Sequence, residues 1–279
     1  MNIPDTMNWH ITYQCNYMCS FCFFRNPEGR IPQAPRLGMT LEQAYGILEK
    51  VKEAGIRRIN YAGGEPTLVR EFPSLVDYSH EIGLSVSVVT NGSDLTDKLL
   101  SSLQGKISAI KLSIDSSSET TEKELGRGYG HHIQHTIAVS EKIRAKGIKV
   151  MANTVVTSLN YTDDMHTLIQ LISPDRWKVF QVLPIEGQNL VEYEKLKVAK
   201  SQFERFVKLH SDIPSMFPED NDLMTESYLM MDPKGRFFQN SGSKYKLSSS
   251  VLNLSVKEAF EEIAFNHEKF DEREVGNQL

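Results

Sequence analysis

The chain has 279 residues, of which 40% are hydrophobic and 24% are charged, and this composition is typical of a folded globular protein. Its formal net charge of −5 argues against general nucleic-acid binding, which usually needs a basic surface. No stretch approaches the roughly 20 consecutive apolar residues of a membrane-spanning helix, and the first residues lack the zones of a secretory signal. We therefore expect a cytoplasmic protein that binds neither a membrane nor nucleic acid.

Apolar, β-branched runs alternate with stretches of helical spacing through the first two-thirds of the sequence. The runs predict strands over residues 9–13, 59–62, 84–90, 107–114, 148–156 and 177–183. The stretches between them predict helices over residues 41–54, 72–82, 95–103, 133–145 and 165–171.

This alternation predicts βαβ units and a parallel sheet. Six units are too few for a closed eight-stranded barrel, so a partial barrel or an open doubly wound sheet remains. Both folds bind ligands at the carboxyl ends of their strands. We expect an α/β protein with a parallel core over residues 1–183 and a C-terminal extension over residues 184–279.

The extension has a different pattern, with few units of alternating strand and helix. We expect helices over 198–209 and 256–265, a hairpin of 228–232 with 236–239, a polar loop over 239–250, and a frayed tail over 271–279.

All three cysteines of the chain, Cys15, Cys19 and Cys22, lie in one short window with the spacing C-x3-C-x2-C. Clustered thiols of this kind indicate metal ligands rather than a disulfide framework. A [4Fe-4S] cluster bound by three cysteines leaves one iron open, and an open metal position is typical of catalysis. The alternative is a structural zinc site with a histidine, although such sites usually use two separated ligand pairs.

Further candidate ligands follow the ends of the expected strands. They are Gly63, Gly64, Glu65 and Pro66 after the second strand, Asn91 after the third, and Ser113 and Asp115 after the fourth. The glycines allow close backbone approach to a ligand, and Glu65 offers a carboxylate to an ammonium group. The other polar residues could instead be helix caps. Arg127, held between two glycines, suits a bidentate contact to a carboxylate or a phosphate.

The cysteine spacing, with Phe21 before the last cysteine, resembles the radical S-adenosylmethionine superfamily. The resemblance implies a [4Fe-4S] cluster whose fourth iron binds the amino and carboxylate groups of S-adenosylmethionine. It also implies that Phe21 and the strand-end residues bind this cofactor, with Arg127 at its carboxylate or, as second choice, at a substrate phosphate. Because no further cysteines can hold auxiliary clusters, most peptide-modifying and sulfur-inserting members are excluded.

Longer matches make the chain similar to the viperin-like antiviral enzymes of this superfamily. They are Cys19–Phe23, Gly126–Gly128, Arg176–Gln181 with Ile185–Gly187, and Pro218–Asn221 with Ser227–Leu229. This resemblance implies that a 5′-deoxyadenosyl radical removes the 4′ hydrogen of a ribonucleoside triphosphate (CTP, UTP or GTP). The product is the 3′-deoxy-3′,4′-didehydro analogue, a chain terminator for polymerases. The reaction needs an electron donor such as flavodoxin or ferredoxin, and we expect a monomer.

Substrate ligands are expected on the last two strands of the core and in the extension. Asn153 and Lys178 occupy inward positions of the fifth and sixth strands, where a buried lysine needs an anionic partner. That partner is either a substrate phosphate or a nearby acid such as Glu186. Tyr228, Lys244 and Lys246 lie where a loop of the extension could close over a nucleotide, although both lysines could equally be surface residues.

Two departures from the animal viperins concern the phosphate contacts. Those proteins have a His-Thr pair where Phe24 and Arg25 stand here, and a lysine where Met151 stands. The phosphate contacts are therefore expected to be redistributed, with Arg25 or Arg30 as a substitute. Two alternatives stay open from the sequence: a radical enzyme acting on a peptide or another metabolite, and a non-catalytic metal-binding module.

Overall fold

The computed structural model of the protein describes residues 2–24 and 36–275. Ten strands form one sheet in the order β10-β9-β8-β1-β2-β3-β4-β5-β6-β7. The strands are β1 (Thr6–His10), β2 (Arg58–Ala62), β3 (Ser85–Thr90), β4 (Ala109–Ser113), β5 (Lys149–Val156), β6 (Arg176–Gln181), β7 (Met216–Glu219), β8 (Met230–Met231), β9 (Arg236–Ser241) and β10 (Lys244–Ser250).

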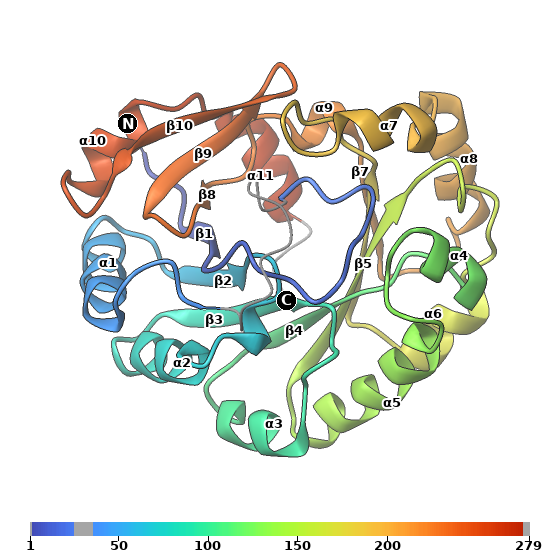
Figure 1. The fold of residues 1–279 in the computed structure, drawn as a ribbon, viewed down its shortest axis with the longest axis horizontal. Helices are drawn as coiled ribbons and strands as arrows, with labels where there is room; N and C mark the ends of the chain where they lie inside the picture. Colours follow the sequence, from blue (N-terminus) through green and yellow to red (C-terminus); the bar gives the residue numbers. More distant parts are fainter. Residues whose placement is uncertain (1, 25–35, 276–279) are drawn as a thin grey trace.

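Helices connect the strands and cover the outer side of the sheet (Figure 1). The helices are α1 (Leu41–Glu53), α2 (Phe72–Glu81), α3 (Asp97–Leu103), α4 (Glu119–Glu124), α5 (His132–Ala145), α6 (His166–Ile172), α7 (Leu190–Leu196), α8 (Lys200–Leu209), α9 (Asn221–Met224), α10 (Val256–Glu261) and α11 (His267–Val275), with a short 3-10 helix over Pro66–Leu68. Among the residues described, none of these helices has the length and apolar character needed to cross a membrane.

Strands β1 to β6 are parallel and pair in chain order, which confirms the predicted partial barrel of six βα units. Side chains on the helix-facing side of the strands are apolar and fully buried, as at Val88, Val150 and Val179. The opposite side of the same strands carries polar residues, including Asn60, Lys111 and Asn153. Since a sheet buries apolar residues against its helices, the polar side faces the inside of the barrel.

The chain beyond residue 183 adds strands to both edges of this parallel core. β7 pairs with β6 at one edge, and β8 pairs with β1 at the other, both in parallel. β7 is four residues long and contains Pro218, which a strand at the edge of a sheet tolerates. The short length and the proline explain why sequence patterns did not predict it.

Two expectations for the extension were wrong. Residues 239–250 were expected to form a loop, but they form most of the β9–β10 hairpin, which turns at Gly242 and Ser243. Both turn residues have positive φ, of 60° and 63°, as a two-residue hairpin turn requires. Residues 271–275 of the expected frayed tail are helical, and Arg273 among them is buried and pairs with Glu219 of β7, whereas residues 276–279 lie outside the described residues.

Candidate active site

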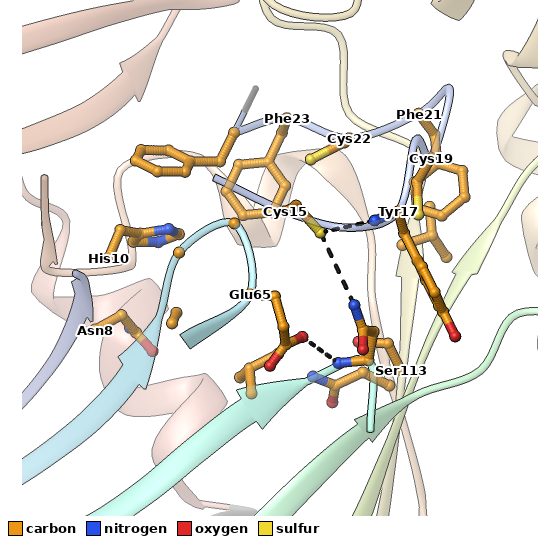
Figure 2. Close-up of a pocket in the computed structure, with 18 of the residues that line it drawn as sticks. Asn8, His10, Cys15, Tyr17, Cys19, Phe21, Cys22, Phe23, Glu65 and Ser113 are labelled. Carbon is orange, nitrogen blue, oxygen red and sulfur yellow. Dashed lines mark hydrogen bonds between the residues drawn. The ribbon is translucent and has the colours of Figure 1, made fainter. Parts of the chain in front are cut away.

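The three cysteines lie on the loop that follows β1, and all three line one cavity of about 750 Å³ inside the barrel. Figure 2 shows this loop across the cavity from Glu65 and Ser113. The loop packs closely on the segment after α4, where the Met18 amide donates to the Gly126 carbonyl at 3.2 Å. Gly126 has a φ of +81°, and a Cβ at this position would lie 2.3 Å from the Met18 oxygen. A glycine is therefore needed at 126 to hold the cysteine loop.

The geometry of the thiols fits a multi-iron cluster better than a single metal ion. Ligands of one zinc ion lie within about 4 Å of one another, since each is bound at about 2.3 Å. Among the described residues, three donor atoms within 4.8 Å of one another occur only at Asp164, His166 and His210, and not at the cysteines. No histidine completes a zinc set with the cysteines there. The three sulfur atoms are therefore spread more widely than the ligands of a single zinc ion.

Cys19 is buried, Cys15 and Cys22 are partly buried, and the surroundings of Cys15 and Cys19 disfavour a negative charge on their thiols. Burial raises the pKa of Cys15 to about 12, with the Glu65 carboxylate adding to the effect, and burial also raises the pKa of Cys19. Thiols of this kind become thiolate ligands when metal charge is present. The three thiols line the cavity and need nearby positive charge to ionise. Both properties suit ligands of an iron–sulfur cluster.

Gly63 and Gly64, at the end of β2, bring a second loop against the cysteine loop. The Gly64 amide donates to the Thr12 carbonyl at 2.7 Å, and the Glu65 amide donates to the Gln14 carbonyl at 2.8 Å. A Cβ on Gly64 would lie 2.0 Å from the Gln14 oxygen. Both glycines also line the cavity. They allow the two loops to approach each other, in addition to the predicted approach to a ligand.

Glu65 joins the end of β2 to the end of β3. Its Oε1 accepts from the Thr67 amide and from the hydroxyls of Thr67 and Thr90, and its Oε2 accepts from the Asn91 amide at 2.7 Å. Burial raises the pKa of this carboxyl, whereas these hydrogen bonds favour its charged form. Oε2 keeps room for a further donor at the cavity wall, so the predicted ammonium contact is available. Pro66 starts the 3-10 helix behind Glu65 and does not line the cavity.

The remaining cofactor candidates surround the cysteine loop from the other side. Asn91 and Ser113 line the cavity, and the Asn91 Nδ2 atom lies 3.8 Å from the Cys15 sulfur. Asp115, which we expected to contact the cofactor, is not among the residues that line the cavity. Its carboxylate is fully buried and accepts from Arg127 Nε at 2.8 Å. Arg127 lines the cavity beside Phe21, with the guanidinium 5.3 Å from the ring centroid.

The expected substrate residues Asn153, Lys178 and Tyr228 line the same cavity, deeper in the barrel. The predicted alternative for Lys178, an ion pair, exists, but its partner is Glu219 of β7 at 2.7 Å and not Glu186. The Tyr228 hydroxyl donates to the other Glu219 oxygen at 2.5 Å. Lys178 and Arg273 hold the pKa of Glu219 at about 2, although its burial opposes this.

Two other substrate candidates, Lys244 and Lys246, do not line the cavity. Lys244 and Lys246 are exposed on β10, and Lys244 pairs at 2.9 Å with Glu186, which is also exposed. Tyr245, between these two lysines, faces the cavity instead and donates to the Phe23 carbonyl at 2.7 Å. Successive strand residues point to opposite faces, so the β10 residue that lines the cavity is the one between the two lysines. Arg25 and Arg30 lie outside the described residues.

Several polar residues of the cavity wall were missed by sequence reasoning. They are Asn8, Asn60, Lys111, Gln181 and Asn240. The Asn60 amide donates to Asn8 at 2.6 Å, which places a polar belt across β1 and β2. Strand alternation was the available signal for two of them. Lys111 lies two residues before Ser113, and Asn60 lies two residues before Ala62, so each pair shares the inward face of its strand.

Comparison with known proteins agrees with this site. The sequence pattern of the Radical SAM superfamily matches residues 9–172. A protein of Flammeovirga pacifica named S-adenosylmethionine-dependent nucleotide dehydratase is 35% identical over 98% of this chain and 95% of its own length. The S-adenosylmethionine-dependent nucleotide dehydratase RSAD2 of Oncorhynchus mykiss is 33% identical over 97% of this chain and 79% of its own length.

Solved structures show the same fold at lower sequence identity. Streptococcus suis SuiB bound to S-adenosylmethionine superposes with a TM-score of 0.71 at 15% identity, over 98% of this chain and 68% of SuiB. The enzyme anSMEcpe with bound AdoMet superposes with a TM-score of 0.68 at 16% identity, over 96% of this chain and 82% of that chain. From the superfamily match and the full-length relatives, the chain belongs to the radical SAM superfamily and, within it, to the S-adenosylmethionine-dependent nucleotide dehydratases.

Proposed function

We propose that this protein converts a ribonucleoside triphosphate (CTP, UTP or GTP) to its 3′-deoxy-3′,4′-didehydro analogue, an antiviral chain terminator. One observation carries the proposal: a single cavity joins the cysteine loop to a polar wall that contains Asn153, Lys178 and Tyr228. A cofactor at the cysteines and a nucleotide at the polar wall would then share one enclosed space. The dehydratase names of full-length relatives support the same reaction.

We assign binding of the cofactor to residues at one end of the cavity and binding of the substrate to residues at the other end. Cys15, Cys19 and Cys22 would hold the [4Fe-4S] cluster, which supplies the electron that cleaves S-adenosylmethionine and starts hydrogen removal. Glu65 offers its free oxygen lone pairs to the cofactor ammonium, and Arg127 offers its outer nitrogens to the cofactor carboxylate. At the other end, Lys178 faces the substrate phosphates.

We also propose that a small electron carrier such as flavodoxin or ferredoxin reduces the cluster from the outer side of the cysteine loop. Two side chains at this loop are open to solvent, with 57% of Met18, which also lines the cavity, and 70% of Tyr129 exposed. The Tyr129 hydroxyl donates to the Asn16 carbonyl at 2.8 Å, so both belong to the surface of this loop. We further propose that the protein acts as a monomer in the cytoplasm, because clustered cysteines of this kind serve as metal ligands rather than as a disulfide framework.

The proposal is tested by an anaerobic assay with reductant and S-adenosylmethionine, in which CTP, UTP, GTP and ATP are offered separately. We expect at least one triphosphate to stimulate formation of 5′-deoxyadenosine strongly, and its nucleoside and monophosphate to do so weakly. The reason is that binding energy from the remote phosphates positions the ribose for reaction. Deuterium from the 4′ position should appear in 5′-deoxyadenosine, and the product should lack one water.

Equal, weak cleavage with every triphosphate and without any would reject the nucleotide substrate. Stimulation by a peptide or another metabolite in the same assay would then identify a different radical enzyme.

Replacing Lys178 with alanine is expected to weaken triphosphate binding about ten- to a hundredfold, the usual effect of losing a charge-assisted hydrogen bond. Iron content should not change, because Lys178 lies at the other end of the cavity from the cysteine loop. Isothermal titration of the reconstituted variant measures this affinity. An unchanged affinity with a lower melting temperature would show that Lys178 only neutralises Glu219.

A further inference from the structure

Lys111, an inward residue of β4, is a cation of the cavity wall that the sequence did not identify. Its side chain lines the cavity, and within the described part of the chain it makes no hydrogen bond or ion pair. On β5, the register partner of Lys111 is Met151. The next inward residue of β5, Asn153, is the register partner of Lys178 on β6. Lys111 and Lys178 therefore lie on either side of β5 and face the same space.

The charges around Lys111 leave an excess of positive charge. Burial and the nearby charge of Lys178 lower the pKa of Lys111 to about 7. The opposing effect of Glu274 on this pKa is smaller than the effect of Lys178. Glu219 accepts from Lys178, Tyr228 and Arg273, so its single negative charge is already shared between two cations. A cation held beside other cations in a low-dielectric space is unfavourable unless an anion comes to it.

Arg176, at the start of β6, adds to this excess. Its three guanidinium nitrogens are buried and have no hydrogen-bond partner among the described residues, and its guanidinium lies 4.2 Å from the centroid of the Phe217 ring. The nearest acid outside the Glu219 group, Glu274, pairs at 2.9 Å with Arg58. The inner end of the barrel thus carries more cations than the acids beside them can neutralise.

We propose that Lys111 is a phosphate-binding residue of this enzyme, which together with Lys178 holds the polyphosphate of the nucleotide substrate across β5. The proposal rests on the proposed function and names the part of the site that recognises a triphosphate. The animal viperins have a lysine where Met151 stands in this chain. Lys111 would supply the positive charge that is absent at that position. Neighbouring strands lie about 4.8 Å apart, so β4 and β6 are about 10 Å apart, and a polyphosphate lying across β5 could contact both lysines.

The test compares Lys111→Met with Lys149→Met in the reconstituted protein. Lys149 is exposed at the start of β5, so its replacement removes the same charge outside the cavity. For Lys111→Met we expect the affinity for the preferred triphosphate, and for inorganic tripolyphosphate as a probe, to fall about ten- to a hundredfold. The affinity for the corresponding nucleoside should stay unchanged, and Lys149→Met should bind all three like the wild type.

Two further measurements separate phosphate binding from a structural role. In the double variant Lys111→Met with Met151→Lys, the charge moves one strand across the same face, so at least part of the lost triphosphate affinity should return. Without nucleotide, Lys111→Met should melt at a temperature equal to or above that of the wild type, because it removes an unpaired charge. A structural lysine would instead give a lower melting temperature and no recovery in the double variant.

Proton uptake gives a readout that does not depend on turnover. Because burial and the charges of Lys178, Arg273 and Arg176 lower the pKa of Lys111 to about 7, against the opposing charge of Glu274, we expect a largely neutral amine in the free protein at pH 8. A bound phosphate favours the ammonium form, so binding should take up a proton. Titration calorimetry in buffers of different ionisation enthalpy should show this uptake in the wild type and a smaller one in Lys111→Met.

The outcomes distinguish this proposal from the function on which it rests. If the wild type binds no triphosphate, the proposed function fails. If the wild type binds a triphosphate and Lys111→Met binds it with equal affinity, the role of Lys111 is overturned and the function stands.

Discussion

Protein in which Cys19 is replaced by alanine is expected to assemble no [4Fe-4S] cluster and to cleave no S-adenosylmethionine. Three thiolates bind three of the four irons and leave one for the cofactor, and the chain has no fourth cysteine to replace one that is lost. The wild type should bind about four irons per chain after reconstitution. Iron and sulfide analysis, with 5′-deoxyadenosine formation, measures both effects.

Ser20→Ala is the matched control for this variant. Ser20 neighbours Cys19 on the same loop and donates to the Leu125 carbonyl at 3.2 Å, so its replacement alters the loop without removing a thiol. It should retain the cluster. A wild type that binds one zinc ion tightly and no iron would contradict the cluster and would favour a non-catalytic metal-binding module.

Gly64→Ala is expected to have the second largest effect, because it acts on the geometry of the cysteine loop through the backbone. The new Cβ would lie 2.0 Å from the Gln14 oxygen and 2.9 Å from the Cys15 nitrogen, and neither atom belongs to a side chain that can rotate away. Overpacking of this kind costs about 1–3 kcal/mol or more. Because the displaced backbone carries Cys15, we expect a lower melting temperature together with a loss of bound iron.

Gly46→Ala provides the control for the same chemical change. Gly46 lies within α1, and nothing lies within 4 Å of the position that its Cβ would occupy. Alanine in a helix is more stable than glycine by about 0.5–1 kcal/mol, so this variant should melt at a higher temperature and keep its iron. If Gly64→Ala also kept its iron and its melting temperature, the contact between the two loops would not determine the site.

The parallel core and the cysteine motif were predictable because their signals are local. Each strand of the core has apolar residues at alternate positions, and the helices between them show apolar residues at helical spacing, as in residues 41–53. The three cysteines lie within eight residues of one another. The β9–β10 hairpin also has a local signal, the turn at Gly242 and Ser243, but the surrounding serines and lysines hid the strands.

The inner part of the site was less predictable, since it depends on contacts between distant segments. The partner of Lys178 is Glu219, which lies 41 residues away on an edge strand. Glu219 in turn binds Arg273, which comes from a segment whose charged sequence resembles a solvent-exposed tail. Lys111 looks like any lysine in an apolar run, and only the arrangement of β4 to β6 places it beside Lys178.

The pairing of β1 with β8 has a consequence for how the chain folds. Asn8 pairs with Met230, so the first strand meets one of its two neighbours only after about 220 further residues. Contacts of such long sequence separation form slowly, and a strand edge that waits for its partner is prone to wrong association. During synthesis the cysteine loop directly after β1 is attached to this incomplete edge. We therefore expect the iron site to reach its final shape late, once the C-terminal strands have emerged and docked.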